Sequence, residues 1–225
     1  MIAAAVAATI VASTASSAII AGWSITTAFP TGTGNVPTGT FYSVGAADQG
    51  DQTVGSQLSS VHALAAATYT SPAGNGSLYS FSSNNWSIGD YYEARLSTSN
   101  YANISLSWDQ ARSSTGPAAF ELEFSTDGTT WTFVTAYTVL QSGGGGAPGT
   151  WSSTTYNPLY TNTQALTGAE NASSLWIRFR STVGAAATGS NRIDNVVISG
   201  DLIPAPGAIA LLGAAGLIGG TRRRR

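Results

Sequence analysis

The sequence of 225 residues contains no cysteine, no lysine, a single histidine and only 9% charged residues. Without cysteine, the chain can form neither a disulfide framework nor a thiolate zinc site, and it has no cysteine nucleophile. With His62 as its one imidazole, it cannot build a zinc site on two or three histidines. A Ser-His-Asp triad would have to use His62, and no Gly-x-Ser-x-Gly turn supports one. We therefore interpret His62 as a structural histidine of the core or of a sheet surface.

Hydroxyl groups and aromatic rings are what the chain has in quantity. Serine and threonine together occupy 57 positions, and Phe, Trp and Tyr make up 10% of the residues. The charged fraction lies far below the roughly 25% of ordinary soluble domains, while the aromatic side chains supply enough apolar area to exclude a disordered chain. At about 100–200 residues per domain, the length fits one domain with a sizeable core.

The N-terminal end indicates export. Residues 2–11 form an apolar run rich in alanine, and small residues follow it up to Ala18. This pattern predicts a secretory signal peptide over residues 1–18, cut after Ala18 or Ala15, with only the amine of Met1 as positive charge before the apolar run. A short buried helix is the alternative interpretation.

The C-terminal end combines three unlike features in order. The motif Ile203-Pro204-Ala205-Pro206 precedes an uncharged apolar stretch over 207–220, and the sequence closes on Arg222, Arg223, Arg224 and Arg225. An apolar segment followed by a positive block is typical of a stop-transfer segment whose arginines stay in the cytoplasm. The 18 residues from Ile203 to Gly220 would rise about 27 Å as a transmembrane helix, close to the ~30 Å hydrocarbon core of a membrane.

This tail, residues 203–225, resembles the bacterial PEP-CTERM sorting signal, with Ala205 in the place of the name-giving glutamate. The resemblance implies an exported protein of the cell envelope, cell surface or extracellular matrix, anchored in the membrane transiently or stably by its C-terminal helix. It also implies a processing protease of the exosortase type as a partner. A cationic tail for nucleic acid is the alternative, which we disfavour because the arginines follow an apolar segment rather than a disordered linker.

The body between the two ends is acidic. From Ile19 to Ile203 the sequence has five arginines against eleven aspartates and glutamates, a net charge of −6. Because affinity for nucleic acid grows with the number of phosphates that a protein neutralises, we expect no DNA or RNA partner.

Alternating apolar and polar residues predict strands throughout this body. In three consecutive segments the residues predicted to face inward are Tyr92, Ala94 and Leu96, then Ala102, Ile104, Leu106 and Trp108, then Phe120, Leu122 and Phe124. Further strands are expected at 41–44, 77–82, 130–140, 175–181 and 193–199, and Asp127-Gly128 predicts a tight hairpin. Only 58–68 could also be helical, and 141–165 is interpreted as a long flexible loop across one end.

These features predict an all-β fold, an antiparallel β-sandwich most like a jelly roll, over residues 19–202. The segments 91–96, 105–110, 124–128 and 191–200 also resemble the jelly-roll ectodomains that often precede PEP-CTERM tails. That resemblance implies a lectin-like or galactose-binding-like domain.

The predicted strand 175–181 carries a candidate glycan-binding set. If its apolar residues face inward, Trp176, Arg178 and Arg180 face outward, where a ring and two guanidiniums could bind an acidic glycan. We favour the alternatives, that both faces of the strand are covered or that the two arginines pair with Glu121 and Glu123. Trp108 and Trp131 are expected in the core.

Glu121 and Glu123 lie two residues apart on one strand face, roughly 6–7 Å apart along the backbone. This spacing is near that of glycosidase carboxylates, but a glycosidase pair flanks the sugar from opposite sides of a cleft. We therefore favour a solvated pair that binds arginines, with Arg95 and Arg112 as further candidates.

Calcium is the candidate metal, because loop carboxylates of secreted sandwiches often bind it. Asp48 and Asp51 could supply oxygens from one loop and Asp194 from another. The alternative for Asp194 is a hydrogen bond or an ion pair with Arg192 or with backbone amides, and Asp127 is explained by its turn.

Taken together, the sequence predicts a non-enzymatic exported protein of the cell surface or extracellular matrix. The alternative is a carbohydrate-binding module that acts on envelope or matrix polysaccharide. A hydrolase is the third hypothesis, and it lacks a recognisable acid–base pair or nucleophile.

Overall fold

The computed structural model describes residues 17–28, 35–143, 145 and 147–204. Within these ranges the chain forms β-strands and one 3-10 helix, η1 (Pro158–Tyr160), and no α-helix, which confirms the predicted all-β class. No helix in the described ranges is long and apolar enough to cross a membrane. Residues 1–16 of the predicted signal peptide and the predicted tail from Ala205 onward lie outside the described residues.

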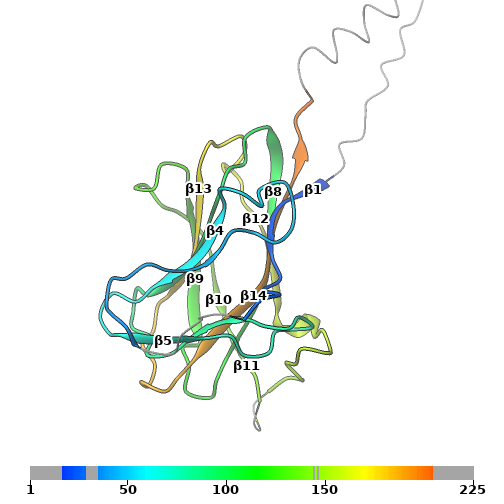
Figure 1. The fold of residues 1–225 in the computed structure, drawn as a ribbon. Helices are drawn as coiled ribbons and strands as arrows, with labels where there is room; N and C mark the ends of the chain where they lie inside the picture. The colour runs from blue at the N-terminus through cyan, green and yellow to red at the C-terminus, as the bar shows by residue number, and fades with distance from the viewer. Residues whose placement is uncertain (1–16, 29–34, 144, 146, 205–225) are drawn as a thin grey trace, which may run out of the picture.

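The strands form two sheets that lie face to face (Figure 1). The six-stranded sheet has the order β10 (Thr132–Thr138), β9 (Ala119–Ser125), β13 (Leu175–Ser181), β7 (Tyr91–Leu96), β4 (Gln57–Val61) and β3 (Tyr42–Gly45). The main path of the eight-stranded sheet is β11 (Leu140–Gln141), β8 (Tyr101–Arg112), β14 (Asn191–Leu202), β6 (Phe81–Ser83), β5 (Ala67–Thr70) and β2 (Asn35–Val36). In addition, β1 (Ser17–Trp23) pairs with β14 and β12 (Thr161–Ala165) with β8. Every pair in the two sheets is antiparallel except β11 with β8.

Apolar side chains from the two inner faces fill the space between the sheets. Trp108 of β8 and Phe179 of β13 are fully buried, with ring centroids 5.2 Å apart across the core. Trp86 packs edge-on against Tyr92 and Phe120 in the same core. Large rings of this kind bury much apolar area each, so a core of aromatic residues is the main source of stability here.

A bulge in β8 changes one predicted face. Asn103 adopts a φ of +52°, where the pairing of β8 with β14 is irregular between Ser199 and Asp201. The alternation changes phase at this point, so Tyr101 is buried while Ala102, predicted to face inward, is only half-buried.

The hairpin between β9 and β10 is confirmed, but its connection is longer than a tight turn. Gly128 supplies a φ of +76°, whereas the carboxylate of Asp127 accepts hydrogen bonds from the backbone N–H groups of Thr130 and Thr129, at 2.7 Å each. These bonds hold the pKa of Asp127 well below its usual range. Because the carboxylate satisfies the turn's own amides, the loop needs no second residue with positive φ.

Two further expectations are corrected. The segment 58–68 contains all of β4 except Gln57, and the start of β5, with no helical turn. The segment 141–165 is not a single flexible loop, because it contains η1 and β12, and β12 pairs with residues 105–109 of β8. The backbone donors and acceptors of this segment complete the edge of β8, which the local sequence pattern does not reveal.

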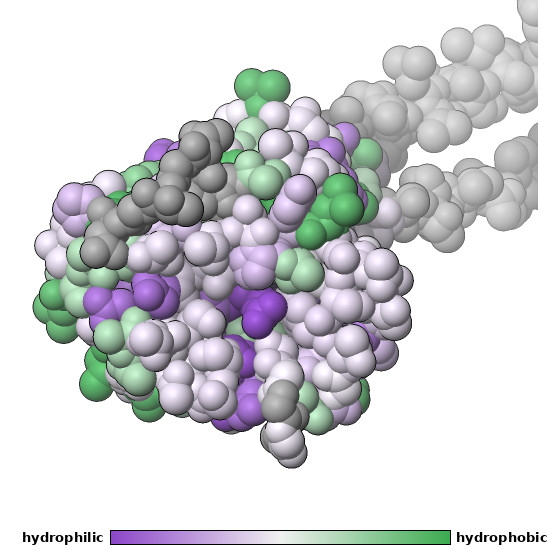
Figure 2. Space-filling view, turned by 60° about the horizontal axis from the view of Figure 1, so that its bottom comes forward, coloured by the Kyte–Doolittle hydropathy of each residue, from purple (hydrophilic) through white to green (hydrophobic). Residues whose placement is uncertain are grey.

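The two described ends of the chain lie side by side at one end of the sandwich (Figure 1), because Ser17 of β1 pairs with Asp201 of β14. From Leu202 back to Arg192, β14 extends about 34 Å at roughly 3.4 Å per residue, toward the opposite end. Figure 2 looks onto that opposite end, where most residues are weakly polar and strongly hydrophilic ones gather near the middle.

Candidate functional site

The outward side of the six-stranded sheet gathers most of the aromatic and charged side chains that the sequence singled out. Since the apolar residues of β7, β9 and β13 face the core, the residues between them face outward. We call this surface the aromatic face; its residues are Tyr91, Glu93, Arg95, Glu121, Glu123, Trp131, Phe133, Trp176, Arg178 and Arg180.

Strand register places these side chains in rows across the sheet. In the central row, Phe133 of β10 lies opposite Glu123, Glu123 opposite Arg178, and Arg178 opposite Glu93. Directly opposite residues on one sheet face have neighbouring side chains, so the row alternates an apolar ring with acid and base. The sequence pattern could identify the outward residues of each strand but not the order β10-β9-β13-β7 that brings them together.

Arg178 is the centre of this face. Its Nε donates to Glu93 Oε2 at 2.7 Å and its Nη2 to the Tyr91 hydroxyl at 3.3 Å. The guanidinium carbon also lies 3.8 Å from the ring centroid of Trp131 and 4.1 Å from that of Tyr91. Trp131, predicted in the core, is therefore a half-buried residue of the outer surface, drawn there by the cation–π contact.

The charges on the aromatic face balance one another. Arg180 binds Glu121 through Nη2 and lies 3.4 Å from Glu123 through Nε, as the sequence allowed, while Arg178 binds Glu93 instead. With Arg95, three arginines thus face three glutamates. Both carboxylates of the Glu121/Glu123 pair contact the same guanidinium, so the pair does not flank an open cleft.

Trp176 and Arg95 form the other row. The Arg95 guanidinium lies 4.8 Å from the Trp176 ring centroid, and Gly128 packs close enough that a side-chain carbon there would lie 3.4 Å from the ring. Arg95 also borders a hollow of about 240 Å³, which is lined by Gln52, Gly55, Ser56, Gln57, Arg95, Leu96, Ser97, Ser173 and Ser174. Its polar lining is hydroxyl and amide groups beside one guanidinium.

Phe133 is the most exposed ring of this surface, with 59% of its area open to water. It stands at the β10 edge, beside Glu123 and outside the core. Sequence reasoning overlooked it, because a phenylalanine in an apolar run such as 132–137 is ordinarily a core residue.

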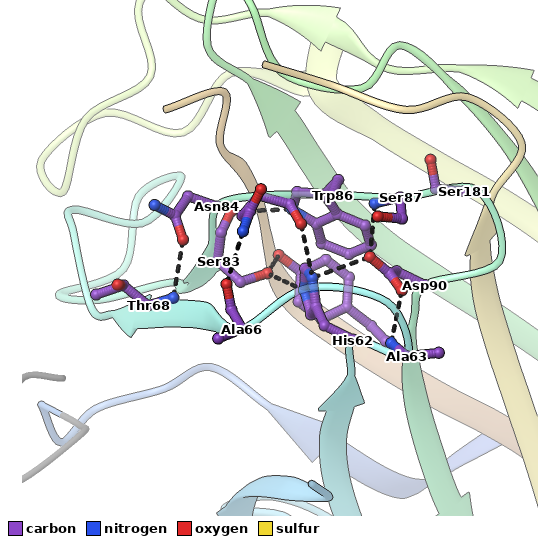
Figure 3. Close-up of polar contacts among 12 residues, drawn as sticks. His62, Ala63, Ala66, Thr68, Ser83, Asn84, Trp86, Ser87, Asp90 and Ser181 are labelled. Atoms are coloured by element: carbon purple, nitrogen blue, oxygen red, sulfur yellow. Dashed lines mark hydrogen bonds and ion pairs between the residues drawn. The ribbon is translucent and has the colours of Figure 1, made fainter. Parts of the chain in front are cut away.

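The single histidine belongs to a buried polar chain (Figure 3). His62 Nδ1 lies 3.0 Å from Asp90 Oδ2, and His62 Nε2 lies 3.1 Å from the hydroxyl of Ser83. With the proton on Nδ1, the ring donates to the carboxylate and accepts from the hydroxyl, which is the hydrogen-bond order of a Ser-His-Asp triad. Ser83 is only 1% exposed, however, and Trp86 packs against the imidazole at 4.6 Å between centroids.

The candidate calcium ligands do not come together. Asp48 accepts from the backbone N–H and hydroxyl of Ser24, and Asp51 accepts from the hydroxyl of Tyr101, at the start of β8. Asp194 pairs in register with Asp109, eight residues further along β8, about 27 Å of strand. No cluster of three or more acidic or histidine side chains in the described ranges is arranged to hold a metal ion.

Asp194 instead belongs to a buried polar cluster on the eight-stranded sheet. Its Oδ2 accepts from the Ser77 hydroxyl at 2.6 Å and from the backbone N–H of Asn75 at 2.8 Å, and it forms no ion pair with Arg192. Its Oδ1 is buried without a hydrogen bond. Burial raises the pKa of Asp194 to about 7, against the opposing effect of these hydrogen bonds.

No protein-family model and no curated protein matches the chain. Among solved structures, the CBM22-1–GH10 modules of endo-1,4-beta-D-xylanase 10B from Clostridium thermocellum, complexed with xylohexaose, align over 84% of this chain with a TM-score of 0.43 and 15% identity. This chain covers 29% of that structure. TmCBM61 in complex with beta-1,4-galactotriose aligns over 64% of this chain and 87% of its own, with a TM-score of 0.35 and 10% identity. The K2 cleaved adhesin domain of Lys-gingipain aligns over 58% of this chain and 80% of its own, with a TM-score of 0.35 and 10% identity.

Proposed function

We propose that the chain is a non-enzymatic carbohydrate-binding protein of jelly-roll type, and that its aromatic face binds a neutral polysaccharide. The observation that carries this proposal is the set of rings on one outward sheet face, with Phe133 59% exposed and Trp176 against Arg95, which lines a hollow of hydroxyl and amide groups. Sugars offer an apolar ring face and a rim of hydroxyls, so a site for them needs aromatic faces next to uncharged hydrogen-bonding groups.

The internal ion pairs favour a neutral ligand over the acidic glycan that the sequence allowed. Arg178 and Arg180 are bound to Glu93, Glu121 and Glu123, so their charge is already neutralised. In this arrangement Arg178 is a positioning residue that holds Trp131 and Tyr91 in place, and Arg180 is bound by Glu121 and Glu123. The two arginines therefore leave ring surface rather than charge to the ligand.

The buried histidine chain supports the non-enzymatic part of the proposal. A triad serine must reach a substrate carbonyl, yet the Ser83 hydroxyl lies in the interior and is shared with the Tyr92 hydroxyl at 3.5 Å. We assign His62, Ser83 and Asp90 to the stability of the fold.

Retention of the full chain on beads of cellulose, xylan, galactan or dextran tests the binding proposal. We expect retention on at least one of these neutral polysaccharides, and a loss of roughly five- to thirtyfold in affinity for Phe133→Ala and for Trp176→Ala, since ring stacking supplies ~1–2 kcal/mol. Tyr156→Ala is the matched control, because this ring is 52% exposed but lies between β11 and β12, which both pair with β8 of the eight-stranded sheet. Equal losses in all three variants, or no retention of the unaltered chain on any polysaccharide, would overturn the proposal.

We also propose that the protein is exported and held at the envelope by the PEP-CTERM-like tail. The position of the described ends supports this arrangement, since β1 and β14 leave the sandwich side by side. Of the two predicted signal-peptide cuts, the one after Ala15 keeps β1 whole, whereas a cut after Ala18 removes its first two residues, Ser17 and Ala18. An exosortase-type protease remains the partner proposed for the tail.

A further inference from the structure

Arg192 differs from the other half-buried arginines of the described ranges. Arg178 and Arg180 bind carboxylates, and Arg112 donates to three backbone carbonyls. The guanidinium of Arg192 makes no hydrogen bond and no ion pair with any described residue, although burial lowers its pKa. A partly desolvated charge without a hydrogen bond or ion pair costs free energy of folding. Arg192 is therefore a cation that the fold itself does not use.

This guanidinium opens onto a hollow of about 280 Å³, lined by Ser142, Gly143, Gly149, Thr150, Trp151 and Arg192. Strand order creates the hollow. Ala111 of β8 pairs with Arg192 on one side and with Leu140 of β11 on the other, so only a methyl group separates the arginine from the segment that follows β11.

Trp151 forms a fixed wall of the hollow. Its Nε1 donates to the carbonyl of Ala73 at 2.7 Å, and its ring stands edge-on to Tyr160 with 5.1 Å between centroids. The Arg192 guanidinium lies 5.7 Å from the Trp151 ring centroid. A planar cation and an aromatic ring therefore border one hollow.

No carboxylate in the described part of the chain forms an ion pair with Arg192. Asp194, two residues along β14, accepts from Ser77 and Asn75. Asp109, opposite Asp194, accepts from the side chains of Asn75 and Asn195 and from the hydroxyl of Thr161. Among the described residues neither acid lines the hollow, and Arg192 is the charged residue of its lining.

We propose that this hollow binds a uronic-acid residue of a polysaccharide, with its carboxylate on Arg192 and its sugar ring against Trp151. The guanidinium matches a carboxylate with two parallel donors, and the ring gives the sugar an apolar face. The volume is just below the roughly 300–1,000 Å³ of pockets for drug-sized ligands, which suits one sugar ring. The site lies on the eight-stranded sheet and does not depend on the aromatic face.

Competition on polygalacturonate beads, with the full chain at fixed ionic strength, tests this site. We expect sodium glucuronate to release the chain at a concentration at least ten times lower than sodium acetate or glucose requires. Acetate supplies the carboxylate alone and glucose the ring alone, so the comparison shows whether both parts are recognised together. We further expect at least a tenfold loss of affinity for Arg192→Gln and for Trp151→Leu.

Arg112→Gln is the matched control, because it removes the same charge from a half-buried arginine that donates to backbone carbonyls and does not line the hollow. We expect it to bind polygalacturonate like the unaltered chain. Unchanged retention of Arg192→Gln with a native circular dichroism spectrum, release by acetate as readily as by glucuronate, or no retention of the unaltered chain would overturn the site. Binding of Arg192→Gln to a neutral polysaccharide reports on the aromatic face separately, so the two proposals can fail independently.

Discussion

The carboxyl group of Asp194 shows how burial can outweigh good hydrogen bonds. Ser77 and the backbone of Asn75 both donate to it, which favours the charged form, yet it is fully buried and Asp109 lies opposite. Burial is the larger effect and raises the pKa to about 7 from 3.8. The folded chain therefore binds this proton more tightly than the unfolded chain does.

The stability that this proton provides should depend on pH in a defined direction. It is fully present below about pH 4, where both states are protonated, and it is lost as pH rises through about 7. Between pH 4 and pH 8 we expect the free energy of unfolding to fall by roughly 3–4 kcal/mol more for the unaltered chain than for Asp194→Asn, which cannot ionise. Urea unfolding at both pH values measures this difference.

Asp48→Asn is the control, because it removes one exposed carboxylate outside the Asp194 cluster. If Asp194→Asn shows the same pH dependence as Asp48→Asn, the raised pKa is wrong.

At the level of single residues, the sequence identified which way side chains face better than what they contact. Alternation placed Trp176, Arg178 and Arg180 outward, and they are. It did not predict that Arg178 binds Glu93 rather than Glu121 or Glu123, because that choice depends on β7 lying next to β13. Partners across strands follow from sheet order, which is a long-range property.

At the level of elements, the His62 chain joins connections that are far apart in sequence. The Asp90 carboxylate accepts from the backbone of Ala63 at 2.9 Å and of Ser87 at 2.6 Å, as well as from the His62 ring. Figure 3 shows these contacts between the segment after β4 and the segment between β6 and β7. These hydrogen bonds thus hold the segment after β4 against the segment between β6 and β7, and so link connections of both sheets.

Removal of one member should leave buried donors or acceptors unsatisfied. We expect His62→Phe and Asp90→Ala each to lower the free energy of unfolding by roughly 1–3 kcal/mol, and the double variant to lose less than the sum, because the two residues share one hydrogen bond. Urea unfolding of the four chains measures the coupling. If the losses of the two single variants add up in the double variant, the hydrogen bond between His62 and Asp90 does not contribute to stability as proposed.

A serine-directed fluorophosphonate provides a second measurement on the same element. A structural Ser83 should remain unlabelled in the native chain, since this residue is only 1% exposed. Labelling of the unaltered protein that disappears in Ser83→Ala would instead assign His62, Ser83 and Asp90 to catalysis.

Periodicity was sufficient for the long strands and failed for the short ones. β13 has the predicted bounds 175–181, and β14 contains all of the predicted 193–199. Of the predicted strand 77–82, only Phe81 and Ser82 belong to β6, because Ser77 hydrogen-bonds Asp194 and the Tyr79 carbonyl instead of a ladder. A strand of three residues is defined by its neighbours rather than by its own pattern.

At the scale of the whole molecule, the two described ends and Arg192 lie at opposite ends of β14. Ser17 pairs with Asp201 at one end, while Arg192 follows the first residue of the strand at the other. If the tail from Ala205 holds the protein at a membrane, the membrane lies beside the β1 end and the Arg192 hollow faces away from it. The proposed export and the proposed uronate site are thus geometrically compatible.

Deletion of residues 221–225 tests the tail at this scale. Arginines beyond an apolar segment stop its transfer and stay on the cytoplasmic side, so removal of Arg222 to Arg225 should shift the protein from the membrane fraction to the soluble exported fraction. A variant with the four arginines replaced by lysine keeps the charge and should fractionate like the unaltered chain. Because the deletion leaves the sandwich intact, both chains should bind polysaccharide equally. An unchanged membrane fraction after deletion would contradict the sorting role, and it would leave both binding sites unaffected.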